Sequence, residues 1–253
     1  MSFLHADFRS ITGPDLLALV TDRIAEMTED DALSALDNRW VTPAVCQKIA
    51  QNPRLTSFYS VRLKLVAHRQ TPQAYAAKLV HYLYWFDLVR LSVEVTVPAP
   101  VRRAIDNQLL ARVDQITPGE RIATARRCSA ALIKVFLFDR DPKVFASLLV
   151  NQRVREEELL YYASSSDAGA AQLAMLATDP KWSSRYALRK TLAANPLTPR
   201  SAAAAQLRYL RADDLKKIYS HPNTSVYVRR CIERLPSHGS SHRSSSPRQK
   251  RID

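Results

Sequence analysis

The sequence predicts an all-α protein built as an α-solenoid, a stack of helix pairs. The main observation is an internal repeat. Residues 52–88 and residues 179–215 align without a gap, at an offset of 127, and are identical at 14 of 37 positions. Glycine is also scarce, with four in 253 residues, and no alternating strand pattern bounded by turn residues stands out. A fixed period of this kind is typical of architectures in which each repeat buries its apolar face against the next.

Each copy is expected to form two helices joined by a short turn. Asn52 or Asp179 can cap the first helix, and a proline follows at its first turn, where a missing N–H costs nothing. The first helix should end before a Thr-Pro pair. Thr71 and Thr198 disfavour helix when they precede proline, but they are good N-caps for the next helix. Two helices of this size cannot bury their apolar faces alone, so neighbouring copies must stack.

The offset of 127 corresponds to about three repeats of roughly 42 residues, and prolines at expected helix starts fit this step. They are Pro53, Pro98, Pro142, Pro180 and Pro222. This pattern resembles HEAT-like repeats, and the A-x-N-P-x-T-P element from Ala193 to Pro199 resembles the leucine-rich-repeat variant family. The resemblance covers roughly residues 40–235. It implies a right-handed α-solenoid of stacked helix pairs, each of about 42 residues, with a binding surface but no particular ligand.

Charge divides the chain into three segments. Residues 1–40 carry a net charge of −5 and are expected to form acidic capping helices, since a terminal repeat needs a polar outer face. Within them, the Thr-Glu-Asp-Asp sequence at Thr28 resembles a capping box. Residues 41–236 carry a net charge of +15 and form the predicted repeat domain. Residues 237–253 are basic, rich in serine and almost without apolar residues, so we expect a disordered tail.

Further helices follow from the apolar spacing and the helix-start signals. They are expected over 41–50, 99–114, 118–138 and 224–235, with another repeat starting at Asp141-Pro142 and its second helix near Glu156. The segment 93–97 is ambiguous, because three valines alternate with polar residues as in a strand. The repeat register places this segment at a helix end, and we follow the register.

Composition and motifs argue against several classes of function. There is no run of 18 apolar residues that would predict a membrane span, and the N-terminus lacks the pattern of a signal peptide. The three cysteines lie far apart without metal-ligand spacing, as expected of reduced thiols in a cytoplasmic protein. No P-loop, dinucleotide fingerprint or nucleophile elbow is present. We therefore expect no enzyme, no cofactor and no metal site.

Paired basic residues recur along the repeat domain. The candidates for binding a partner or phosphate are Arg102, Arg103, Arg126, Arg127, Lys190, Arg229 and Arg230. If stacked helices present them on one face, they form a positive stripe suited to phosphates, although a solvated face is the plain alternative. The HEAT-like resemblance implies another role for Arg62 and Arg189. In such repeats an arginine often pairs with an aspartate to tie repeats together, and Asp87 and Asp214 would be the partners.

The leading hypothesis is a non-enzymatic scaffold or adaptor that binds an acidic macromolecule, expected to be a protein, on its concave face. The alternative is nucleic-acid binding through phosphate contacts, aided by the basic tail. A third is a DNA glycosylase, because HEAT-like alkylpurine glycosylases hold DNA in a basic concave surface near Trp and Asp residues. Their motif does not match Trp85 and Asp87 residue by residue. Core packing is therefore the favoured role for Trp85 and Trp182.

Overall fold

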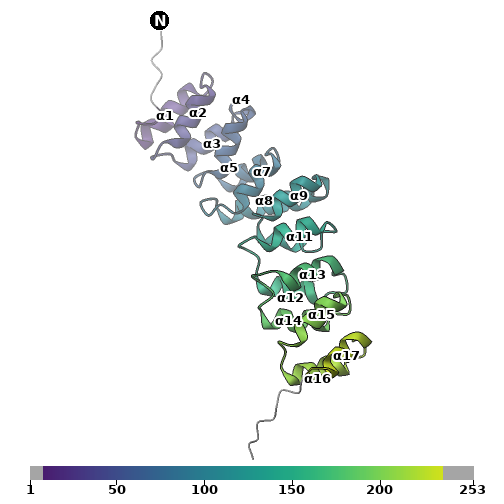
Figure 1. The fold of residues 1–253 in the computed structure, drawn as a ribbon. Coiled ribbons are helices and arrows are strands. Elements are labelled where there is room, and N and C mark those ends of the chain that lie inside the picture. Colours follow the sequence, from purple (N-terminus) through teal and green to yellow (C-terminus); the bar gives the residue numbers. More distant parts are fainter. Residues whose placement is uncertain (1–7, 236–253) are drawn as a thin grey trace, which may run out of the picture. The chain divides into compact units, whose positions relative to one another are not determined.

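The protein is all-α throughout the part of the chain that the computed structural model describes, residues 8–235 (Figure 1). Seventeen short α-helices and one 3-10 helix follow one another in this range, which contains no strand. The all-α prediction is confirmed, and the valine-rich segment 93–97 is a loop between two helices. The helices divide into two compact units, one ending at Arg155 and one beginning at Glu156. The predicted tail 237–253 lies outside the described residues.

The first unit holds helices α1 to α11. They are α1 (Gly13–Arg23), α2 (Glu29–Asp37), α3 (Pro43–Gln51), α4 (Pro53–Ser57), α5 (Tyr59–Ala67), α6 (Gln73–Val80), α7 (Trp85–Ser92), α8 (Ala99–Arg112), α9 (Pro118–Ala125), α10 (Ala130–Phe136) and α11 (Pro142–Leu149), with a 3-10 helix at Val113–Gln115. One row of this unit runs through α1, α3, α6, α8 and α10, each packed on the next. The other row includes the pairs α2 with α5 and α9 with α11.

The second unit holds the remaining six helices. They are α12 (Glu156–Ser164), α13 (Ala170–Thr178), α14 (Tyr186–Ala194), α15 (Arg200–Leu207), α16 (Ala212–Ser220) and α17 (Val226–Glu233). Here α12, α14 and α16 form one row of successive contacts, and α13, α15 and α17 form the other. Both units are thus built from helix pairs that pack in the order of the chain, as expected of a helical repeat.

Six helices of the first unit recur in the second at the offset that aligns the two sequence copies. The pairs α2/α12, α3/α13, α5/α14 and α6/α15 have the same bounds once this offset is subtracted. The pairs α7/α16 and α8/α17 begin at the same repeat position and differ only in where they end. The duplicated region therefore spans 29–112 and 156–233, well beyond the stretch that sequence identity revealed.

The expected repeat length was wrong. Successive helix pairs begin at Glu29, Tyr59 and Trp85 in the first copy and at Glu156, Tyr186 and Ala212 in the second. These steps are well short of the expected length of about 42 residues. The error came from treating the prolines as equivalent, because each occupies a different kind of position. Pro53 and Pro142 begin a helix, Pro98 precedes one, and Pro180 and Pro222 lie in turns.

Local capping explains several of the helix starts. The Asn52 side chain accepts from the main-chain N–H groups of the first turn of α4, and Thr28 forms the expected capping box at α2. Thr71 and Thr198 were expected to cap as well, but each is followed by a proline that takes the cap position itself. The proline backbone is extended there, so the helix begins one residue later and the two threonines are buried instead.

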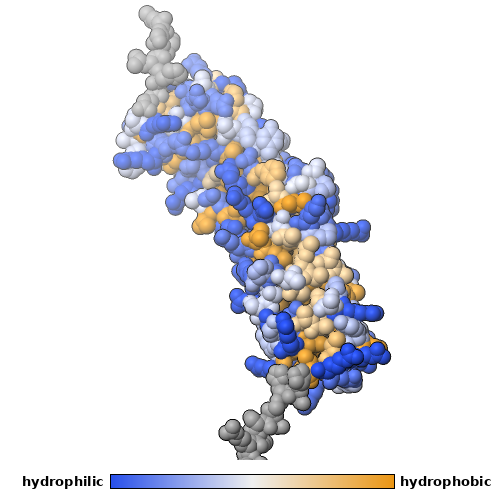
Figure 2. All heavy atoms as spheres, viewed as in Figure 1, coloured by the Kyte–Doolittle hydropathy of each residue, from blue (hydrophilic) through white to orange (hydrophobic). Residues whose placement is uncertain are grey.

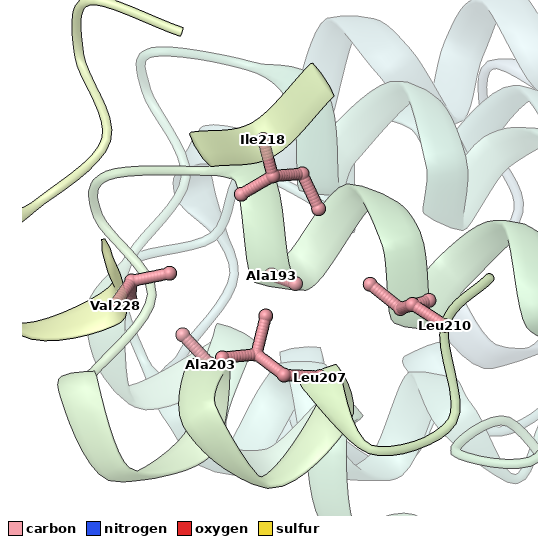
Figure 3. Close-up of a cluster of buried hydrophobic side chains, with 6 residues drawn as sticks. All are labelled: Ala193, Ala203, Leu207, Leu210, Ile218 and Val228. Carbon is pink, nitrogen blue, oxygen red and sulfur yellow. The ribbon is translucent and has the colours of Figure 1, made fainter. Parts of the chain in front are cut away.

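Apolar side chains from successive helices close the core of the second unit (Figure 3). Leu207 of α15 and Ile218 of α16 are each at most 3% exposed, and Val228 of α17 packs beside them. Burial of a leucine or isoleucine side chain contributes about 1.5–3 kcal/mol, so a few such contacts hold each helix pair on the next. Within residues 8–235, none of the helices has the length and apolar character that crossing a membrane would require.

Three asparagines that follow α2, α11 and α14 join these helix ends to earlier parts of the chain. In each of them the side-chain oxygen accepts from the N–H two residues on, at 2.7–2.9 Å. The amide nitrogen donates to main-chain carbonyls that lie far earlier in the chain. These residues are Asn38, Asn151 and Asn195. One side chain thus satisfies a turn and a neighbouring helix end, both of which would otherwise leave polar groups unpaired.

Candidate functional site

Two equivalent clusters of tyrosine, arginine and aspartate lie at matched positions in the two copies. The first cluster is Tyr59, Arg62, Tyr82, Tyr84 and Asp87, and the second cluster is Tyr186, Arg189, Tyr209, Arg211 and Asp214. Four of the five positions are identical, and the fifth exchanges Tyr84 for Arg211. Each cluster joins the start of one row helix to the start of the next, α5 to α7 and α14 to α16.

The first cluster is rich in aromatic surface. Tyr59 donates its hydroxyl to the Asp87 carboxylate and accepts from the Tyr84 main-chain N–H at 3.2 Å. Burial, followed by the bond to Asp87, raises the pKa of Tyr59 to about 12. The Tyr84 ring stacks on Tyr59 at 4.3 Å, and the Arg62 guanidinium lies over Tyr59 and Tyr82. Tyr82 and Tyr84 are 63% and 68% exposed, so the cluster presents two rings to solvent.

The second cluster keeps the same anchor but is basic. Tyr186 donates to Asp214 at 2.6 Å and accepts from the Arg211 main-chain N–H at 3.0 Å. The Arg211 guanidinium lies over the Tyr186 ring at 5.3 Å, in the place that Tyr84 takes in the first cluster. Arg189 stacks on Tyr209 at 3.8 Å, and Tyr209 is still 45% exposed. The same backbone geometry therefore presents guanidinium groups where the first copy presents rings.

Two further cations adjoin the second cluster. Lys190 forms an ion pair with Asp214 at 2.8 Å. The hydrogen bond from Lys190, and then that from Tyr186, lowers the pKa of Asp214, while Asp214 raises the pKa of Lys190. Arg208 lies over the outer ring, Tyr209, at 4.7 Å. Lys190 is thus neutralised inside the cluster, whereas no ion pair of Arg208 or Arg211 is described among residues 8–235.

The contact expected between Arg62 or Arg189 and the aspartates is made by tyrosines instead. Both arginines turn toward the carbonyl groups that precede their own helix. Arg62 lies 3.4 Å from the Ser57 oxygen, and Nε of Arg189 donates to the Ser183 oxygen at 2.5 Å. The arginines therefore close the turn before α5 and α14, and the tyrosine hydroxyls tie successive helix pairs together.

The predicted arginine pairs divide into one structural and one exposed member. Arg102 and Arg229 are partly buried at equivalent positions of α8 and α17. Arg102 donates to the Glu94 carbonyl at 3.4 Å, and Arg229 donates to that of His221 at 2.9 Å. Their neighbours Arg103 and Arg230 are exposed.

Arg126 and Arg127 are also exposed, but they lie in a turn rather than within a helix. The expected helix over 118–138 is broken there into α9 and α10. The described contacts do not join these two arginines, or Arg103 and Arg230, to either cluster. Of the predicted paired residues, Lys190 is the one described in contact with a cluster, through its ion pair with Asp214.

A second duplicated feature is a groove at the ends of row helices. In the second unit it measures about 490 Å³ and is lined by Ser164–Ser166, the end of α14 and His221. In the first unit the equivalent groove measures about 390 Å³ and is lined by charged side chains, among them the ion pair of Lys64 with Asp37. The two linings differ in chemistry, so the grooves do not point to one shared ligand.

The residues that suggested enzymatic or metal chemistry have structural partners. Trp85 is 5% exposed and donates from its ring nitrogen to Thr124 at 2.8 Å, and Trp182 is also buried. Burial raises the pKa of the Cys46 thiol to about 11, which disfavours the reactive thiolate. Within residues 8–235 no group of three or more His, Cys, Asp or Glu side chains is placed to hold a metal ion.

We found no family model, curated protein or solved structure that matches the chain. The function therefore has to be argued from the geometry of the two copies. The eight cluster residues that the copies share were visible in the sequence as identical repeat positions, but the contacts among them were not. Sequence reasoning missed Arg208 and Arg211 because they differ between the copies, and no pairwise identity could mark them.

Proposed function

We propose that the chain is a non-enzymatic helical-repeat scaffold, a right-handed α-solenoid of the HEAT-like type, that binds an acidic protein partner on its concave face. The observation that carries this proposal is the pair of equivalent tyrosine–arginine clusters. Tyrosine and arginine are the residues most enriched at protein interfaces and among the side chains that dominate binding energy. A net charge of +13 favours an acidic partner and speeds its association.

The distribution of hydrophilic and apolar side chains on the surface agrees with a binding surface of mixed character. Hydrophilic side chains cover much of the visible face of both units, interrupted by apolar patches (Figure 2). The exposed rings at Tyr82, Tyr84 and Phe86 are contributed by one short segment of the first unit. Exposed rings beside guanidinium groups supply contact area and charge at the same point, which suits a protein surface with aspartate or glutamate side chains.

Nucleic-acid binding is the second candidate, and the exposed arginines favour it. Arg103, Arg126, Arg127 and Arg230 are free to reach phosphates, and exposed tyrosine rings could stack on bases. The two candidates differ in their response to salt and nuclease. Binding to nucleic acid weakens steeply with salt, in proportion to the number of phosphates contacted.

The test uses the full chain as bait for extracts of its source cells, with and without nuclease treatment. The proposal predicts acidic proteins that stay bound after nuclease treatment and bind directly when purified. Loss of all bound material after nuclease treatment, with tight and salt-sensitive binding of oligonucleotides, would overturn it in favour of the second candidate. Changing Arg102, Arg103, Arg126 and Arg127 to Ala should then weaken oligonucleotide binding.

A further inference from the structure

We propose that the loop joining α15 to α16 in the second unit is the docking point for an aspartate- or glutamate-rich segment of the partner, bound through Arg208 and Arg211. This inference rests on the proposed function and adds to it a place and a chemistry. The loop follows Leu207, the last residue of α15, and α16 begins at Ala212. It therefore presents two arginines on one short connection.

Both arginines are exposed, and both are held against tyrosine rings. The Arg208 guanidinium lies 4.7 Å from the Tyr209 ring centre, and that of Arg211 lies 5.3 Å from the centre of Tyr186. A guanidinium stacked on a ring keeps its edge N–H groups available, and the edge is what binds a carboxylate in a bidentate manner. Stacking also restricts the side chain before binding, which lowers the entropy lost on association.

The acidic groups near Arg208 and Arg211 leave both guanidinium groups available to bind a carboxylate of a partner. The acidic group nearest in the cluster, Asp214, is engaged by Lys190 and by the Tyr186 hydroxyl. Asp213 is exposed and adds one further negative charge. Arg189 is committed to Tyr209 and to the Ser183 carbonyl. The cations in and beside the second cluster, Lys217 included, therefore outnumber its two carboxylates, and Arg208 and Arg211 belong to this excess of positive charge.

The first copy provides the comparison that assigns the chemistry. The equivalent positions there are His81 and Tyr84, on the same backbone and beside the same anchor, Tyr59. Tyr84 stacks where Arg211 does, so the geometry of the position is retained while its charge is not. A structural need for a stacked group explains a ring or a guanidinium equally well. The need for a stacked group does not explain why both loop positions are arginine in the second copy. A carboxylate ligand explains both arginines.

The experiment measures binding of a short fluorescein-labelled peptide of alternating Glu and Gly by fluorescence anisotropy at about 0.15 M ionic strength, where the Debye length is about 8 Å. Arg208→Glu with Arg211→Glu in the full chain should weaken binding at least about tenfold, since reversing a charge removes an attraction and adds a repulsion. The matched control is Arg200→Glu with Lys181→Glu, which makes the same change of charge at exposed positions of the same unit, outside the loop and α16. It should weaken binding less than about threefold, because screened charges away from the contact act weakly.

A charge-preserving variant shows whether binding depends on the planar guanidinium group or only on positive charge. Arg208→Lys with Arg211→Lys should bind the peptide several-fold more weakly than the native chain, because an ammonium lacks the fork and the stacking. Unchanged far-UV circular dichroism shows that each variant is folded. Lysine substitutions without effect, or equal losses in the glutamate variant and its control, would overturn the assignment and leave the proposed function standing. If the native chain binds an oligonucleotide of equal charge but not the peptide, the proposed function itself is wrong.

Discussion

Replacing Asn195 by alanine should destabilise the second unit selectively. Its amide nitrogen donates to the Ala163 carbonyl at 2.6 Å and to that of Ser165 at 3.3 Å, and its oxygen accepts from the Leu197 N–H at 2.8 Å. Alanine removes all three bonds and leaves the buried Ala163 carbonyl unpaired. At about 0.5–1.5 kcal/mol for each bond, and with partial rehydration of the exposed partners, we expect a loss of about 2–3 kcal/mol.

Urea denaturation followed by circular dichroism gives the free energy of unfolding, and hydrogen exchange assigns the loss to a unit. Because two compact units need not unfold together, the amides of α14 and α15 should lose protection before those of the first unit. Asn223→Ala is the matched control, since this asparagine is exposed and has no described side-chain hydrogen bond. A loss as small as that of the control would refute the role assigned to the asparagines.

The variant Asn195→His separates the hydrogen bond that closes the turn from the two hydrogen bonds to the end of α12. The equivalent residue of the first copy is His68, whose Nδ1 accepts from the Gln70 N–H at 3.1 Å, so histidine preserves the turn. It does not reproduce the two donations from the asparagine amide. We expect this variant to recover part of the stability lost in Asn195→Ala, and full recovery would mean that the bonds to α12 contribute nothing.

Three further predictions concern packing, the clusters and pH. Leu207→Ala should cost about 2–5 kcal/mol by opening a cavity among buried side chains, measured by urea denaturation. Tyr186→Phe should cost about 1–2 kcal/mol by removing both bonds of its hydroxyl, whereas Tyr209→Phe should be neutral. Burial, followed by the positive charge of Lys64, lowers the pKa of His68 below its ordinary 6.5. Below pH 6.5 the unfolded chain therefore binds a proton at His68 more readily than the folded chain does, and the free energy of unfolding should fall. The fall should be smaller in the His68→Gln variant.

The all-α class and the packing of helices in the order of the chain followed from the sequence, whereas the repeat length and the full extent of the duplication did not. The helices α2 and α12 have equivalent bounds but share few identical residues, because a helix in a stack needs only its apolar spacing. The proline spacing gave the wrong repeat length because proline is tolerated at a first helical position, at a cap and in a turn alike. The internal match was detected only over 52–88 and 179–215, where identical apolar residues occur together with the tyrosine, arginine and aspartate of the clusters.

The clusters could be located from the sequence in part, but their contacts could not. Arg62 and Asp87 were expected to pair because the resemblance to HEAT-like repeats implies an arginine–aspartate contact between repeats. The structure instead joins Asp87 to the Tyr59 hydroxyl and leaves Arg62 against rings and a carbonyl. Which of two suitable donors reaches a carboxylate depends on side-chain length and helix orientation, and neither can be read from one sequence.

Comparison of the two clusters distinguishes the positions that hold the fold together from the positions that are free to vary. Tyr59 and Tyr186 each bond a carboxylate and a main-chain N–H, so replacing either would leave that N–H without its partner and remove one bond from the carboxylate, and both copies keep tyrosine. The group stacked on that ring satisfies no such requirement, and it is tyrosine in one copy and arginine in the other. A duplicated chain can therefore change what each copy presents to a partner without weakening its fold.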